Sequence, residues 1–176
     1  MKTKNLFFRF SVLLALFILL GLNTFAQKER LQTAFIFQLT RLIEWCPDGK
    51  QGNFVIGVLG NEPALMAELA ALKSRRVGTQ EIEIVTFNNV ADITRANIIF
   101  VSDGQFDNIG AVGEKVTGFC TLIVSDRPGS AGRGAGVSIA YNQREGKLEF
   151  EIQRSYMRRN SFNVNDQLYN LASRVY

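Results

Sequence analysis

The chain has 176 residues, with 20 lysines and arginines, 16 aspartates and glutamates, two cysteines and no histidine. The absence of histidine excludes a Ser-His-Asp triad, a Cys-His pair and a histidine-ligated metal site. Three of the cations, Lys2, Lys4 and Arg9, lie in the first 26 residues, which hold no acidic residue; removing these three from 20 leaves 17 basic against 16 acidic residues. This near balance removes the electrostatic basis for binding nucleic acid, so we predict no nucleic-acid partner.

Residues 1–26 have the pattern of a secretory signal peptide. A basic start is followed by the apolar run 10–22, and small residues occupy Thr24 and Ala26. As a helix, the 13 apolar residues rise about 20 Å, which is short of the ~30 Å hydrocarbon core of a bilayer. We therefore predict cleavage after Ala26, a mature domain over residues 27–176, a periplasmic location and no stable membrane anchor after cleavage.

Residues 29–45 predict a helix with one broad apolar arc, which includes Phe35. Phe37 falls outside this arc, on the side that carries Arg41 and other polar residues. Single exposed apolar residues are ordinary on protein surfaces, but aromatic residues are also enriched where proteins meet. Phe37 and Arg41 are therefore candidate contacts with a partner protein, and a homodimer contact is a second possibility.

The segments that follow alternate between strand and helix patterns. Strands are predicted at 53–59, 81–87, 97–101, 120–124, 137–141 and 147–152, and helices at 64–73, 105–117 and 164–176. The alternating polarity of 81–87 places it near a sheet edge, whereas the continuous apolar runs 97–101 and 120–124 are typical of central strands. The order predicts a single α/β domain: a mixed, mostly parallel sheet of about six strands, helices on both faces, and a C-terminal hairpin plus helix.

Two predicted strands end alike, in Ser102-Asp103 and in Ser125-Asp126. Ligands of open α/β sheets sit at the carboxyl ends of the strands, so these residues, with Asn61 after the first strand, are candidates for binding a small molecule. Serine and aspartate also cap helices and turns, and that structural alternative stays open. No phosphate-binding loop or nucleophile motif is present, so we predict no catalytic residue, no cofactor and no metal.

The two cysteines and a basic segment near the C-terminus complete the candidates. Cys46 and Cys120 form an even pair in an exported chain, which favours a disulfide, although two buried free thiols are the alternative. Arg154, Tyr156 and Arg158 lie close together in sequence and suit an acidic protein surface, although a solvated face is the simpler interpretation.

Six segments, in this order, resemble the YfiR-like periplasmic proteins. They are AFIFQLTRLIEW from Ala34, FVIGVLGNEP from Phe54, IIFVSD from Ile98, LIVSDRPG from Leu122, GKLEFEI from Gly146 and QLYNLA from Gln167. The resemblance spans about residues 30–176 and marks a distant member, in which Cys46 stands between a Trp and a Pro that usually adjoin.

The resemblance implies a non-enzymatic regulator with a compact α/β fold. Its best-known members bind the periplasmic sensor domain of an inner-membrane diguanylate cyclase and hold the cyclase inactive, and related domains accompany sensor histidine kinases. We therefore predict an exported protein that binds and represses such a membrane signalling protein. A periplasmic sensor module that binds a small molecule at the strand ends is the alternative.

Overall fold

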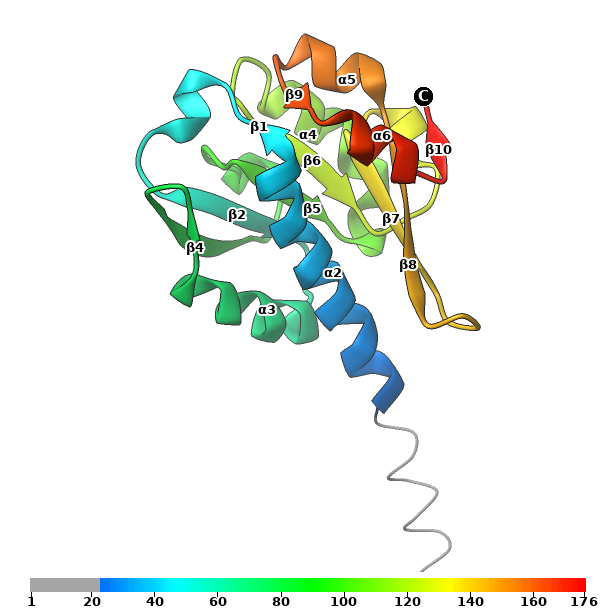
Figure 1. Cartoon of the computed structure of the whole chain (residues 1–176). Coiled ribbons are helices and arrows are strands. Elements are labelled where there is room, and N and C mark those ends of the chain that lie inside the picture. The colour runs from blue at the N-terminus through cyan, green and yellow to red at the C-terminus, as the bar shows by residue number, and fades with distance from the viewer. Residues whose placement is uncertain (1–22) are drawn as a thin grey trace, which may run out of the picture.

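A computed structural model describes residues 23–176 (Figure 1). The predicted signal peptide, residues 1–26, lies outside the described residues except for the backbone of its last four, which begin helix α2 (Asn23–Leu42). The other α-helices are α3 (Pro63–Ala70), α4 (Ile109–Lys115), α5 (Arg154–Arg159) and α6 (Asp166–Leu171). Within residues 23–176, no helix combines the length and apolar character needed to cross a bilayer.

The main sheet has eight strands in the spatial order β10-β8-β7-β6-β5-β2-β4-β3. Their bounds are β2 (Phe54–Leu59), β3 (Arg76–Val77), β4 (Gln80–Phe87), β5 (Ile98–Val101), β6 (Leu122–Ser125), β7 (Val137–Asn142), β8 (Lys147–Ile152) and β10 (Arg174–Val175). The predicted mixed, mostly parallel sheet is confirmed. The six expected strands are all present, and the two-residue strands β3 and β10 extend the sheet at its edges.

Strands β4, β2, β5, β6 and β7 run parallel to one another, while β8 pairs antiparallel with β7 as the expected hairpin. The connection through α3 leaves β2 in one direction, and the connection through α4 leaves β5 in the other. Because such crossovers are right-handed, α3 and α4 lie on opposite faces of the sheet. Helix α2 contacts α3 and crosses the same face in Figure 1, so helices cover both faces as predicted.

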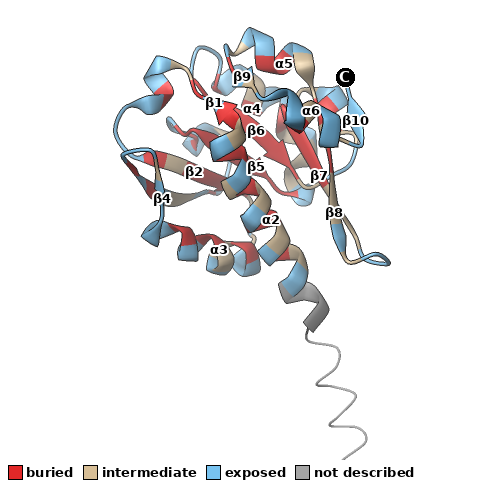
Figure 2. Cartoon of the chain, viewed as in Figure 1, coloured by how far each residue is buried: buried red, intermediate tan, exposed pale blue. Residues whose placement is uncertain are grey.

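The core lies along the central strands, which are buried throughout (Figure 2). Ile98, Phe100 and Ile123 have no exposed surface, as continuous apolar strand patterns lead one to expect. Trp45 closes one end of the core, where its ring lies edge-on to Phe54 at 4.9 Å and to Phe162 at 5.2 Å between ring centres.

Two predicted helices end earlier than their sequence patterns suggest. The first ends at Leu42, because the next two residues form β1 (Ile43–Glu44), which pairs antiparallel with β9 (Asn163–Val164). The last ends at Leu171, because β10 pairs with the outer edge of β8. There the backbone N–H of Tyr176 donates to the carbonyl of Ile152 at 2.9 Å. In both places the chain leaves the helix and pairs with a strand from another part of the sequence, which satisfies backbone N–H and C=O groups of that strand. The polarity pattern of a single segment cannot reveal such a pairing.

Candidate functional site

An apolar groove of about 860 Å³ lies between α2 on one side and β8 with α6 on the other. Its side chains come from three separate segments: Leu31, Ala34, Phe35, Gln38 and Leu42 on α2, residues 146–150 around the start of β8, and Leu168, Leu171 and Ser173 at the C-terminal end. The ring centres of Phe35 and Phe150 are 4.8 Å apart and form the floor where the two walls meet.

The groove exists because the apolar arc of α2 is wider than the surface that the sheet and α3 cover. Ile36 and Leu39 are fully buried, whereas Leu31, Phe35 and Leu42 are only half-buried. On the opposite wall Leu171 is 64% exposed, the largest exposure among the big apolar residues of the described chain. Leaving these side chains in contact with water costs free energy in proportion to their apolar area, so the groove is a surface that gains from being covered.

Two arginines lie beside the α2 wall of the groove. Arg30 and Arg41 are both exposed and stand eleven residues apart, which is about three turns of helix and places them on the same side, next to Ala34. Neither forms an ion pair with another group in residues 23–176. On the opposite wall the charge of Lys147 is shared with Glu145 at 2.6 Å and Glu149 at 3.2 Å. The unpaired charge along the groove is therefore positive on the α2 side.

The predicted contact residues are only partly on this surface. Arg41 is exposed beside the groove. Phe37 was predicted to project among polar side chains, but it is half-buried and packs against the core. Thr33 and Thr40 on the same side of α2 are also buried, so this side of the helix faces the protein although it carries polar residues. The predicted exposure of Phe37 is therefore corrected: this aromatic ring completes a helix packing surface and leaves only part of itself to solvent.

Tyr156 is removed from the contact set, because its side chain is 5% exposed. Its hydroxyl donates to the carbonyl of Thr121 at 2.8 Å and accepts from the N–H of Ile123 at 3.2 Å, and burial raises the pKa of this phenol. Arg154 stacks on the ring of Tyr169 at 4.0 Å. Sequence proximity grouped these residues, but the turn of α5 sends the tyrosine inward and the arginines outward.

Arg158, with its neighbour Arg159, is exposed on α5.

The groove itself was not predicted, although its signal was present in the sequence. The half-buried leucines of α2 belong to the broad arc of residues 29–45, and Leu168 and Leu171 share one face of the predicted last helix. What the sequence could not show is that these two apolar faces meet across β8.

The strand-end residues lie at one edge of the sheet, as predicted, because Leu59, Val101 and Ser125 stand in register at the ends of β2, β5 and β6. The two serines there serve the fold. Ser102 is buried and packs against Gly60, whose φ of +113° and missing Cβ permit the close approach. Ser125 is fully buried, and its hydroxyl oxygen accepts from the N–H of the loop residue two positions later at 3.3 Å.

The other strand-end candidates differ in their surroundings. Asn61 is exposed. Asp103 is exposed and pairs with Arg127 at 3.6 Å, and the guanidinium of Arg127 lies 4.0 Å from the ring centre of Phe106. Asp126 is the exception, since only 5% of its side chain is exposed, and within the described part of the chain its ionic partner is Lys28 at 3.4 Å. Burial raises the pKa of the Asp126 carboxyl.

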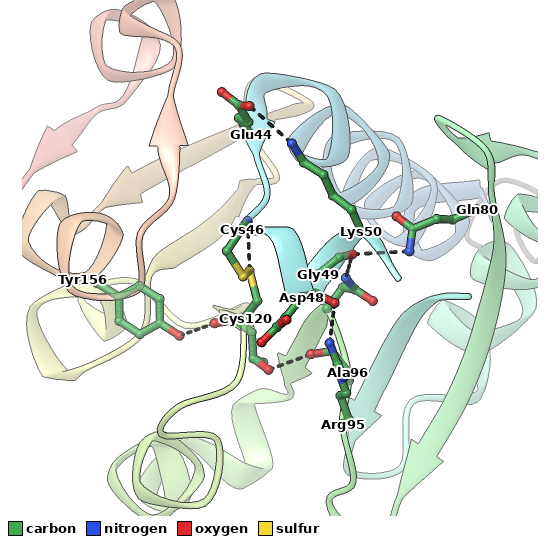
Figure 3. Close-up of a disulfide and its surroundings, with 12 residues drawn as sticks. Glu44, Cys46, Asp48, Gly49, Lys50, Gln80, Arg95, Ala96, Cys120 and Tyr156 are labelled. Carbon is green, nitrogen blue, oxygen red and sulfur yellow. Dashed lines mark hydrogen bonds and ion pairs between the residues drawn. A yellow bond between two sulfur atoms is a disulfide. The ribbon is translucent and has the colours of Figure 1, made fainter. Parts of the chain in front are cut away.

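Cys46 and Cys120 are joined by a disulfide, which settles the alternative that the sequence left open (Figure 3). The bridge ties the loop after β1 to the residue pair before β6, at the amino edge of the parallel strands, with a Cα separation of 6.1 Å. Beside it, the carbonyl of Gly49 accepts from the side-chain amides of Asn97 at 2.7 Å and Gln80 at 3.3 Å. These amides hold the loop that carries Cys46 against the sheet.

Among residues 23–176, no group of three or more histidine, cysteine, aspartate or glutamate side chains has an arrangement that could hold a metal ion.

The comparisons with known proteins agree with the α/β architecture of this chain. A family model described as YfiR/HmsC-like matches residues 29–173. Because the match spans most of the sequence, the chain belongs to the YfiR/HmsC-like family. A search of curated proteins gives no match.

Two solved structures share the fold. The ABC domain in complex with L-Trp from Streptococcus pneumoniae superimposes with a TM-score of 0.56 at 11% identity, over 86% of this chain and 60% of that one. A conserved domain protein from Vibrio cholerae O1 biovar eltor gives a TM-score of 0.50 at 14% identity, over 70% of this chain and 55% of that one. The chain thus spans a little over half the length of each neighbour, and at these identities the likeness concerns the fold alone.

Proposed function

We propose that this protein is an exported, non-enzymatic regulator that binds the extracytoplasmic domain of an inner-membrane signalling protein and holds it inactive. The partner class is a diguanylate cyclase or a sensor histidine kinase. In this proposal residues 1–26 direct export and are removed, and residues 27–176 act in the periplasm. The family membership and the secretory pattern of the N-terminus support this assignment.

The observation that carries the proposal is the open apolar groove between α2, β8 and α6. A groove with a hydrophobic floor and a charged margin has the anatomy of a protein-binding surface, in which an apolar centre supplies affinity and polar margins supply orientation. Leu171 and Phe35, which line the groove, are the proposed central contacts with the partner. Arg41 lies at the charged margin of the groove. The unpaired positive charge of Arg30 and Arg41 favours a partner segment with acidic residues beside its apolar face.

The disulfide is consistent with a protein that folds outside the cytoplasm, where cysteines are oxidised. It lies at the amino edge of the parallel strands and supplies no residue to the groove. Arg158, which is exposed on α5, and Arg154, which is half-buried against the ring of Tyr169, remain secondary contact candidates. Tyr156 and Phe37 serve mainly the packing of the protein.

The experiment is co-purification with the extracytoplasmic domains of inner-membrane diguanylate cyclases and sensor histidine kinases from the same organism, followed by measurement of the dissociation constant. Leu171→Asp is expected to weaken binding on the order of thirtyfold, because it places a charge at the centre of an apolar contact. Phe119→Asp is the matched control, since Phe119 is 43% exposed, lies just before Cys120 at the other edge, and is outside the groove.

The Phe119→Asp variant is expected to bind as the unmodified protein does. Equal weakening by both variants would show that the groove is not the contact surface. If no extracytoplasmic sensor domain binds under either reducing or oxidising conditions, the proposed function itself is wrong.

A further inference from the structure

The outer edge of β8 is paired along only part of its length. Strand β10 covers the end of β8 that leads to α5, where residues 174–175 stand in register with 151–152. Within residues 23–176, no strand lies beside the outer edge of 147–149, and in Figure 1 this half of β8 extends past β10 toward the hairpin turn. The sheet therefore has an open edge at the end of β8 nearest the turn.

The backbone groups on this open edge can be identified from their neighbours. The carbonyls of Phe150 and Ile152 point outward, because they accept from the N–H groups of Ser173 at 2.8 Å and Tyr176 at 2.9 Å. Alternate residues of a strand turn their backbone groups to the same side, and β8 pairs with β7 without a bulge. The N–H and C=O of Leu148 and the N–H of Phe150 therefore also point outward. None of these three groups makes a hydrogen bond to another backbone group in residues 23–176.

The apolar groove follows this open edge. Successive side chains of a strand point to opposite faces of the sheet, so a groove on one face would be lined by every second residue. This groove is instead lined by the consecutive residues 146–150. Strand β7, which is described over its whole length, supplies no lining residue. The groove therefore runs along the outer side of β8, where the three outward backbone groups line it.

The side chains around the open edge define the kind of strand that fits beside it. Leu148 shares the face of Phe150, whose ring packs against Phe35 on α2, whereas Lys147 and Glu149 point to the other face. The two exposed arginines beside the α2 wall stand about 16 Å apart along the helix, a distance that a strand covers in about five residues. A matching strand therefore has apolar side chains toward α2, polar side chains on the other face, and acidic residues that reach the arginines.

We propose that the open edge of β8 receives an extended, acidic segment of the partner's extracytoplasmic domain as an added strand that continues the line of β10. This inference rests on the proposed function, since it takes the groove as the contact surface, and it adds how the partner is held. Main-chain hydrogen bonds to Leu148 and Phe150 supply affinity, and the apolar and acidic side chains supply selectivity. A helix in the groove would bury the three backbone groups without partners, because a helix pairs its own N–H and C=O groups internally.

Exchange of backbone amides with deuterium, followed by NMR on the purified protein, tests this geometry directly. In the free protein the amides of Glu149 and Glu151, which face β7, are expected to exchange slowly, and those of Leu148 and Phe150 rapidly. In the complex with the sensor domain, an added strand should slow the exchange of Leu148 and Phe150 on the order of a hundredfold, because exchange then requires the pairing to open.

Two variants separate the backbone of Leu148 from its side chain. Leu148→Ala keeps the N–H and should weaken binding of the sensor domain severalfold through lost apolar contact. Leu148→Pro also removes the N–H and should weaken binding on the order of a further tenfold. Proline is tolerated where a strand edge faces solvent, and slow exchange at Glu149 and Glu151 in the free variant shows that the pairing with β7 is intact.

The probe for the edge by itself is the peptide acetyl-Glu-Val-Thr-Val-Thr-Val-Glu-amide, which alternates apolar and polar residues and carries an acidic residue at each end. Its binding in an NMR titration should be saturable and should slow the exchange of Leu148 and Phe150. Replacing both glutamates of the peptide with lysine, or Arg41→Glu in the protein, should weaken binding on the order of tenfold at low salt. Arg75→Glu, at an exposed site outside the groove, is the matched control and should leave the affinity unchanged.

Failure of this inference is distinguishable from failure of the proposed function. If a sensor domain binds while Leu148 and Phe150 still exchange rapidly, and Leu148→Pro binds as Leu148→Ala does, the function stands and the added strand is wrong. If no sensor domain binds, the proposed function is wrong and the peptide decides: saturable binding with slowed exchange supports the edge as a strand-binding site, and no binding overturns it. Slow exchange of the same two amides in the free protein that depends on protein concentration assigns the edge to a second copy and also overturns the proposal.

Discussion

Replacing either Cys46 or Cys120 with alanine is expected to lower the free energy of unfolding by about 4.5 kcal/mol. The bridge closes a loop whose ends are 74 residues apart. For that length the chain-entropy relation gives a loss of about 15 cal/mol/K in the unfolded state, which is about 4.5 kcal/mol at 25 °C. In a domain of this size the melting temperature should fall by about 10–15 °C.

The assay is urea denaturation followed by circular dichroism, with thermal scans in parallel. Because one bridge is lost whichever cysteine is replaced, the two single variants and the double variant should be destabilised by similar amounts. The unmodified protein in reducing buffer should match them. Single-variant losses that add up in the double variant would assign the effect to packing of the side chains, and unchanged midpoints would refute the reasoning from loop closure altogether.

Three further predictions concern buried groups. Tyr156→Phe removes the hydroxyl that links Thr121 and Ile123 and should lower the free energy of unfolding by about 1–3 kcal/mol in urea denaturation. Tyr169→Phe should cost little, because this ring is half-buried and its hydroxyl makes no hydrogen bond to another group in residues 23–176. Gly136→Ala would place a Cβ 2.8 Å from the ring of Tyr156 and should cost about 1–3 kcal/mol through overpacking; Gly104→Ala, with open space around it, is the comparison. Burial raises the pKa of Asp126 above its ordinary 3.8, so the folded protein holds this proton to higher pH than the unfolded chain and loses stability as pH rises past that value. Asp126→Asn should therefore gain stability relative to the unmodified protein as the pH rises above about 4, and a pH-independent difference in urea titrations would contradict the assignment.

Much of the fold follows from patterns within single segments. The apolar runs 97–101 and 120–124 became the buried central strands β5 and β6, and the alternating run 81–87 became β4, with only the short β3 outside it. In each of these segments the spacing of apolar residues is typical of a single kind of element: a continuous apolar run indicates a buried strand, and alternation indicates a strand with one exposed face. The type of element therefore follows from the residues of the segment itself. The two helix ends that were wrong, at 43–45 and beyond 171, depend on strands from elsewhere in the chain.

For the function as well, some properties follow from the sequence and others only from the tertiary structure. The sequence by itself determined the absence of histidine chemistry, the secretory pattern and the family, because composition and motif order are properties of the chain. Only the tertiary structure decided that Cys46 and Cys120 meet, that Tyr156 is buried, and that Lys28 pairs with Asp126 across nearly a hundred residues. These facts depend on which faces of distant elements pack together, and packing is decided by the whole set of burial and pairing interactions, which no single segment contains.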